Sequence, residues 1–104
     1  MNKAKFLANL SIGAALVATV AHAADPAAGQ KKFEATCAAC HGANGISVAP
    51  IYPNLAGQKD AYLATQMKAF RDGSRANAIM APMAKGLSDT DIANISAYLA
   101  ALKP

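Results

Sequence analysis

The chain has 104 residues, with ten Lys and Arg against six Asp and Glu, two Cys and no Trp. This length allows one small domain. Without Lys3 and Lys5, which precede the domain, eight basic and six acidic side chains leave a formal net charge of +2. Because no basic cluster is longer than Lys31-Lys32, the composition argues against nucleic acid as a partner.

Residues 1–23 are predicted to be a cleaved signal peptide. A basic start is followed by a mostly apolar stretch over residues 6–20 and by Ala-His-Ala at residues 21–23, the small-x-small pattern of a cleavage site. A membrane anchor is the alternative, but a bilayer span needs about 20 apolar residues. We therefore expect an exported protein with no integral membrane span, whose domain is residues 24–104.

A first helix is predicted from Asp25 and Pro26, since Asp is a good N-cap and Pro fits the first helical position. Gly29, Phe33 and Cys37 then recur at i, i+4 and i+8 and share one face. Residues 41–57 follow with three Gly, two Pro and two Asn and no helical period, which predicts an irregular loop.

A second helix is predicted over residues 59–72, because Leu63, Met67 and Phe70 fall on one face and Gly73 supplies a C-terminal stop. Residues 74–86 contain Pro82 and lack a clear period, so they are predicted to be a second loop.

The last helix has the clearest start, with Ser88 as N-cap and Asp91 at the third position of a capping box. No segment alternates like a strand, and the expected fold class is all-α. A chain of this size buries a modest core and often needs a cofactor or disulfide to hold together. The candidate core residues are Phe33, Leu55, Leu63, Phe70, Ile92, Ile95 and Leu99.

The most informative motif is Cys37-Ala-Ala-Cys40-His41, because C-x-x-C-H is the attachment signal of c-type haem. At helical spacing the two thiols and the imidazole share one face, so the thiols can bond to the haem vinyl groups while His41 binds the iron. A thioredoxin-like site normally lies in a βαβ context, which this chain does not offer. A structural disulfide would be cramped at this spacing, and zinc would lack further Cys or His ligands.

Two methionines are candidates for the second axial ligand of the iron. Met80 and Met83 flank Pro82, and thioether ligation raises the reduction potential of a haem. An isolated Met is usually core filler, but a pair in a non-periodic segment favours ligation by one of them.

Several motifs together resemble the class I c-type cytochromes, above all the small periplasmic ones that occur as single domains or as halves of di-haem proteins. They are the C-x-x-C-H sequence, Pro-Asn-Leu-Ala-Gly at residues 53–57, Ile-Met-Ala-Pro-Met at residues 79–83 and Ala-Tyr-Leu at residues 97–99. The resemblance covers essentially the whole domain. It implies three main helices and loops wrapped around one covalently bound haem c, in a periplasmic electron carrier.

The resemblance also assigns roles to individual residues. Cys37 and Cys40 would hold the haem covalently, and His41 and Met80 would be the axial iron ligands, with Met83 as the fallback. The Pro53 carbonyl would accept the imidazole N–H, and Gly29 and Phe33 would pack the first helix against Tyr98. We left Tyr52, Tyr62, Gln66, Arg71 and Arg75 out of the predicted site, since solvation of a helix surface explains them equally well.

With both axial positions filled, no position stays open for substrate, so we expect no catalytic residues and no enzymatic activity. The expected partners are redox proteins: a reductase or dehydrogenase as donor and a terminal oxidase or reductase as acceptor, meeting a monomeric carrier. The rivals are a C-x-x-C thiol oxidoreductase, a cytochrome with displaced Met that binds small molecules, and a haem subunit of a dehydrogenase.

Overall fold

The computed structural model describes residues 23–104, so the predicted signal peptide lies outside the described residues except for Ala23. This part of the chain forms helices and loops and contains no strand, which confirms the all-α prediction. The elements in chain order are α1 (Pro26–Thr36), α2 (Ala38–His41), α3 (Asp60–Asp72), α4 (Met80–Lys85) and α5 (Asp89–Ala100). No helix among residues 23–104 is long and apolar enough to cross a membrane.

The first and last helices begin where the sequence predicts. The Asp25 carboxylate accepts hydrogen bonds from Ala27 N (3.0 Å) and Ala28 N (3.3 Å) at the start of α1. Ser88 and Asp91 form the predicted capping box of α5, at 3.0 and 3.1 Å. Both caps satisfy backbone N–H groups that have no partner within the helix.

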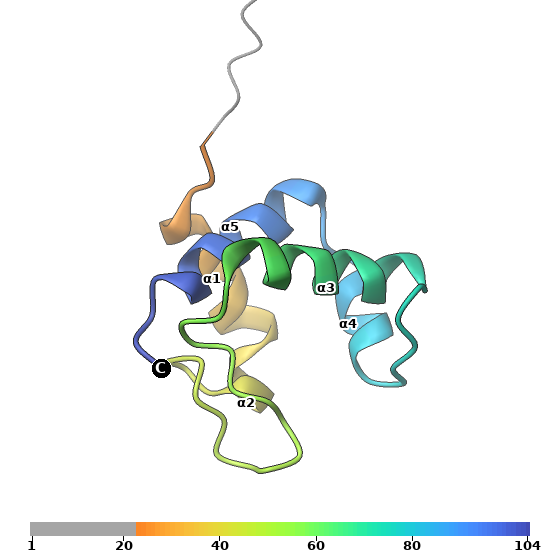
Figure 1. Cartoon of the computed structure of the whole chain (residues 1–104), viewed down its shortest axis with the longest axis horizontal. Helices are drawn as coiled ribbons and strands as arrows, with labels where there is room; N and C mark the ends of the chain where they lie inside the picture. Colours follow the sequence, from red (N-terminus) through yellow and green to blue (C-terminus); the bar gives the residue numbers. More distant parts are fainter. Residues whose placement is uncertain (1–22) are drawn as a thin grey trace, which may run out of the picture.

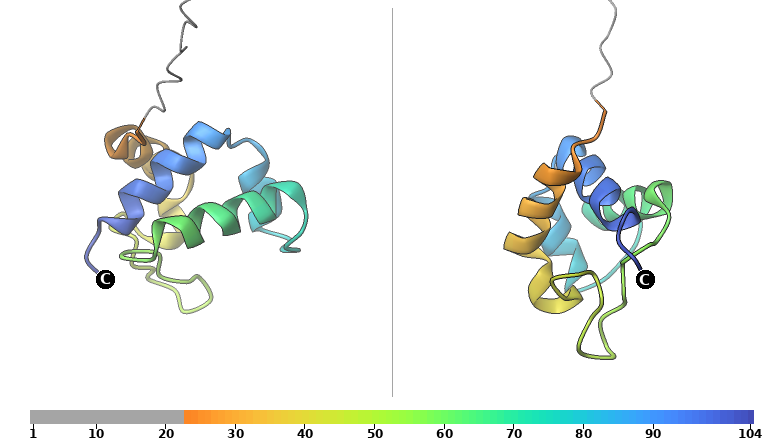
Figure 2. Two further views of the ribbon diagram at one scale, coloured as in Figure 1. Left: turned by 45° about the horizontal axis from the view of Figure 1, so that its top comes forward. Right: turned by 90° about the vertical axis from the view of Figure 1, so that its left-hand side faces the viewer.

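Helices α1 and α5 cross at close range, and α3 packs against α5 on another side (Figures 1 and 2). Gly29 makes this crossing possible, because a Cβ built on it would lie 2.0 Å from Asn94 O. The Phe33 and Tyr98 rings lie 5.7 Å apart between centroids, tilted by 54°. The predicted packing of α1 on α5 is therefore confirmed, with Gly29 against the backbone near Asn94 and Phe33 against Tyr98.

The core follows the predicted residues closely. Six of the seven are buried, whereas Leu55 is half-buried and packs against the edge of the core. Ala84 and Leu87 are also buried and were not among the predicted set. Ala84 comes from the segment that was predicted to be a loop, and Leu87 directly follows that segment.

That prediction was wrong in part, because residues 80–85 of the segment form α4. Pro82 is the third residue of the helix, where the missing N–H has no intrahelical partner to lose. A six-residue helix is also too short to show a 3.6-residue period in sequence. A smaller difference is that His41 ends α2, so the loop predicted over residues 41–57 begins one residue later than expected.

Candidate functional site

A largely apolar cavity of about 450 Å³ lies between α1, α2, α3, α4 and the loop after His41. Its walls come from nearly every element, and several residues of the hydrophobic core also line it. The residues that the sequence analysis singled out on its wall are Cys37, Cys40, His41, Met80 and Met83.

The C-x-x-C-H motif forms one helical turn. Cys37 ends α1 and begins α2, and its carbonyl oxygen accepts hydrogen bonds from Cys40 N (3.2 Å) and His41 N (3.0 Å). Both cysteines are half-buried free thiols on the cavity wall. Burial raises the pKa of the Cys37 thiol, against the lowering effects of the Thr36 hydrogen bond and of Lys32.

The His41 imidazole is buried, with 6% of its surface exposed. Its Nδ1 lies 2.9 Å from the carbonyl oxygen of Pro53, as the resemblance implied. A carbonyl oxygen only accepts, so Nδ1 must carry the proton and donate it. In the neutral imidazole this leaves the lone pair on Nε2, which is the atom that then binds a metal, and the hydrogen bond fixes the ring orientation.

The loop that carries Pro53 is closed by side-chain hydrogen bonds. Ser47 Oγ donates to Tyr52 O (2.6 Å), and Ser47 N donates to Asn54 Oδ1 (2.8 Å). At the base of the loop, Gly45 O accepts hydrogen bonds from the backbone N–H groups of residues 55 and 56, at 2.8 and 3.1 Å. Sequence reasoning missed Ser47 and Asn54; their signal was the preference of Ser and Asn for local bonds to loop backbone.

The two methionines lie at i and i+3 on α4, and both line the cavity. Met80 is half-buried and packs against the core cluster, whereas 47% of the Met83 surface is exposed. The sequence predicts a non-periodic loop here, whereas in the structure the backbone of both residues is helical.

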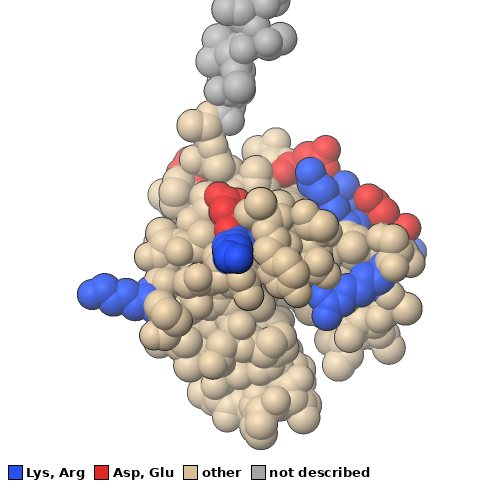
Figure 3. Space-filling model, viewed as in Figure 1, with Lys and Arg blue, Asp and Glu red and all other residues tan. Residues whose placement is uncertain are grey.

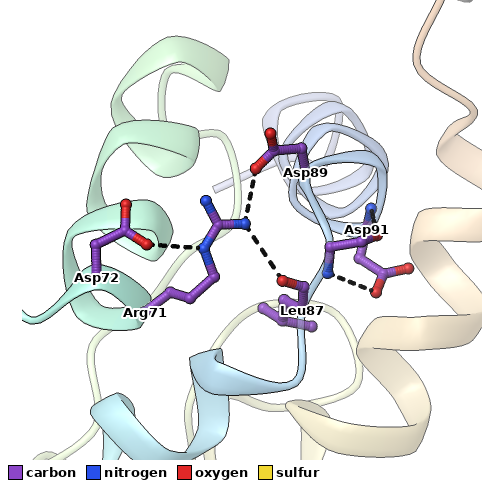
Figure 4. Close-up of polar contacts among 6 residues, drawn as sticks. Arg71, Asp72, Leu87, Asp89 and Asp91 are labelled. Carbon is purple, nitrogen blue, oxygen red and sulfur yellow. Dashed lines mark hydrogen bonds and ion pairs between the residues drawn. The ribbon is translucent and has the colours of Figure 1, made fainter.

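Of the five polar residues left out of the predicted site, four line the cavity: Tyr52, Tyr62, Gln66 and Arg75. Contact with the Cys40 side chain raises the pKa of the Tyr52 phenol. The fifth, Arg71, is not on the cavity wall. It bonds to Asp89 Oδ1 (2.7 Å), Asp72 Oδ1 (3.0 Å) and Leu87 O (3.3 Å), as Figure 4 shows.

The residues on the cavity wall fit a covalently bound haem. Apolar side chains form most of the wall and suit the porphyrin faces. Two adjacent thiols suit thioether bonds, and the Nδ1-protonated imidazole beside them suits the iron. The thioethers of α4 supply a second donor type that haem iron accepts.

A comparison with known proteins agrees with this chemistry. The family model described as cytochrome c matches residues 26–103. The chain belongs to the cytochrome c family. The five helices are thus the small class I cytochrome c fold, and the chain is an electron carrier with one covalently attached haem c.

Individual relatives place the chain within this family. It is 57% identical over 79 residues to cytochrome c-554(548) of Halomonas halodenitrificans, covering 73% of this chain and 94% of the relative. It is 47% identical over 104 residues to cytochrome c4 of Pseudomonas aeruginosa, covering 99% of this chain and 50% of the relative. The chain therefore spans most of the first protein but about half the length of the second.

One solved structure in the comparison is an enzyme. The thiosulfate dehydrogenase of Marichromatium purpuratum superposes with a TM-score of 0.69 at 40% identity, covering 76% of this chain and 19% of that chain. The relatives are thus mostly cytochromes, and the fold also occurs as a part of a larger redox enzyme.

Proposed function

We propose that the chain is a periplasmic, monomeric carrier that moves single electrons between redox proteins, a reductase or dehydrogenase as donor and a terminal oxidase or reductase as acceptor. In this proposal residues 1–23 are a cleaved signal peptide and residues 24–104 are the cytochrome domain. Cys37 and Cys40 hold the haem covalently, and His41 and Met80 are its axial ligands, with Met83 as the fallback.

The observation that carries the proposal is the hydrogen bond from His41 Nδ1 to Pro53 O beside two free thiols. It supports an imidazole whose Nε2 is held ready for a metal. The burial of Met80 relative to Met83 supports Met80 as the second ligand, since a buried thioether is less exposed to competing water.

The protein's own residues shape the chemistry. A haem c bound here supplies an iron that alternates between ferric and ferrous states. His41 and Met80 would occupy both axial positions, which favours outer-sphere electron transfer over substrate binding. The apolar wall excludes water and, with the Met80 thioether, favours a high reduction potential.

The surface near the cavity supports contact with an uncharged partner face. No Asp, Glu, Lys or Arg occurs between Glu34 and Lys59, and the lower part of the molecule in Figure 3, which holds α2 and the following loop, is uncharged. Val48 and Ile51 on this loop are 93% and 77% exposed.

The proposal is tested by expressing the full chain in a host that attaches haem c and isolating the periplasmic fraction. Mass spectrometry should give the mass of residues 24–104 plus one haem, and an anaerobic titration should take up one electron per chain. A thiol-only protein without haem, or a protein retained with its leader in the membrane, would contradict it.

A second candidate is a haem subunit of a dehydrogenase, favoured by the likeness to the thiosulfate dehydrogenase structure. Gel filtration of the periplasmic extract with detection of haem absorption separates the two. A free carrier elutes at the size of one domain, whereas a subunit elutes with a larger protein.

A further inference from the structure

We propose that Asn77 is a positioning residue for Met80, holding the backbone of the proposed iron ligand through its side-chain carboxamide. This inference rests on the proposed ligation of the iron by Met80. It concerns which residue holds the Met80 backbone in place, and membership of the family does not assign that role.

The chain reaches α4 through a segment that is poorly anchored by burial. Residues 72–79 are all exposed, so no apolar side chain among them fixes their path. Within this segment Arg75 is anchored, because its guanidinium lies 4.5 Å from the Phe70 ring centroid and donates to Gln66 Oε1 at 2.7 Å. Beyond Arg75, polar contacts must set the course of the backbone.

Asn77 supplies those contacts at the start of α4. Its Oδ1 accepts hydrogen bonds from Ile79 N (2.9 Å) and Met80 N (2.8 Å), and its backbone oxygen accepts from Ala81 N (3.0 Å). One residue therefore binds three successive amides, including that of Met80. Asn is among the best residues for this capping geometry, because its short carboxamide reaches backbone N–H groups two and three residues ahead.

The far end of α4 has a separate polar attachment. Arg71 of α3 donates to Leu87 O at 3.3 Å and pairs with Asp89 at the start of α5 (Figure 4). Ala84, the fifth of the six residues of α4, is fully buried. The end of α4 is thus fixed by burial and by Arg71, whereas its beginning, where Met80 lies, is fixed by Asn77.

The test uses the haem-loaded protein in four forms: wild type, Asn77→Ala, Asn77→Ser and Asp25→Ala. Ser keeps a neutral capping oxygen and is the conservative rescue. Asp25→Ala is the matched control, because Asp25 also caps two amides but does so at the start of α1. Three readouts follow Met80: the iron–thioether charge-transfer band of the oxidised protein, displacement of the thioether by imidazole, and amide hydrogen exchange at Met80.

Loss of one cap is expected to raise the equilibrium constant for local opening of the first turn of α4 about fivefold. Asn77→Ala should therefore raise both the apparent imidazole affinity and the Met80 exchange rate by about that factor, while Asn77→Ser and Asp25→Ala stay close to wild type. Wild-type behaviour of Asn77→Ala, or an equal increase in Asp25→Ala, would overturn the inference. A wild type without the thioether band would overturn the proposed Met80 ligation, and this inference with it.

Discussion

The two walls of the cavity that carry the proposed iron ligands His41 and Met80 are built in different ways. On the first wall, the proposed ligand His41 directly follows Cys40 in sequence, is buried, and is braced by a loop closed through Ser47 and Asn54. On the second wall, the proposed ligand Met80 lies on a six-residue helix reached through an exposed segment. The first wall is fixed by short-range hydrogen bonds around a tight turn. The second is fixed by the Asn77 cap at the start of α4 and by the hydrogen bonds of Arg71 beyond its end, here called the Arg71 clamp.

In the proposed site, this difference would hold His41 firmly and leave Met80 more adjustable. The His41 wall depends on backbone geometry that few residues can adopt. The Met80 wall depends on side-chain bonds that are each worth about 1 kcal/mol. We therefore expect substitutions on the His41 wall to cost folding stability, and those on the Met80 wall to change the ligand first.

The largest effect should come from removing the two cysteines that would attach the haem between the two walls. The double variant Cys37→Ala, Cys40→Ala has no covalent attachment for the haem that would fill the central cavity. We expect it to lose cooperative unfolding by circular dichroism, because 81 residues bury too little apolar surface alone. Native helicity and a cooperative thermal transition without haem would contradict this.

The second largest effect should come from replacing Met80, the proposed second ligand. Met80→Ala should remove the iron–thioether band, lower the reduction potential and allow carbon monoxide to bind the reduced protein. It should also cost about 2 kcal/mol or more of stability, as for other Met→Ala changes against a core. Met83→Ala is the matched control and should keep the band; the opposite result from the pair would make Met83 the ligand.

The third prediction compares a glycine on each wall. Gly42 follows His41 with a φ of +83°, and a Cβ there would lie 1.9 Å from Ile46 O. Gly86 follows α4 with a φ of −82° and open space around it. Gly42→Ala should cost about 1–3 kcal/mol in chemical denaturation, whereas Gly86→Ala should be neutral or stabilising. Equal costs would remove the contrast between the walls.

The smallest effect concerns the clamp at the end of α4. Arg71 holds the pKa of the Asp89 carboxyl below its usual value, chiefly through their hydrogen bond. A lowered folded-state pKa contributes stability above the unfolded value of about 3.9, and this contribution is lost as pH falls through the folded pKa.

Asp89→Asn should therefore be slightly less stable than wild type at pH 7, and the difference should shrink as pH falls below about 4 and disappear once pH is below the folded-state pKa. Urea unfolding at both pH values measures it. A difference that persists unchanged in acid would mean that the pair contributes nothing through its charge.

The sequence predicted the His41 wall better than the Met80 wall, for physical reasons. The C-x-x-C-H motif packs three chemical groups into five residues, and the caps at Asp25 and Ser88 are local signals. The short helix α4 was missed because Pro82 resembles a helix breaker unless its position in the first turn is known.

Contacts between distant segments could not be derived in the same way. Arg71 meets Leu87 and Asp89 across 16 and 18 residues, so nothing local in the sequence distinguishes it from a solvated helix residue. Leu55 was expected in the core but is half-buried, since it lies on the cavity wall. In both cases the position depends on how the elements pack around the cavity.

The central claim is that His41 and Met80 together close the coordination of one haem iron. The most direct measurement is the visible absorption spectrum of the oxidised and reduced haem-loaded protein, with and without carbon monoxide. The account predicts a low-spin c-type spectrum that carbon monoxide leaves unchanged. A carbon monoxide shift in the wild type would contradict it, because one axial position would then be open.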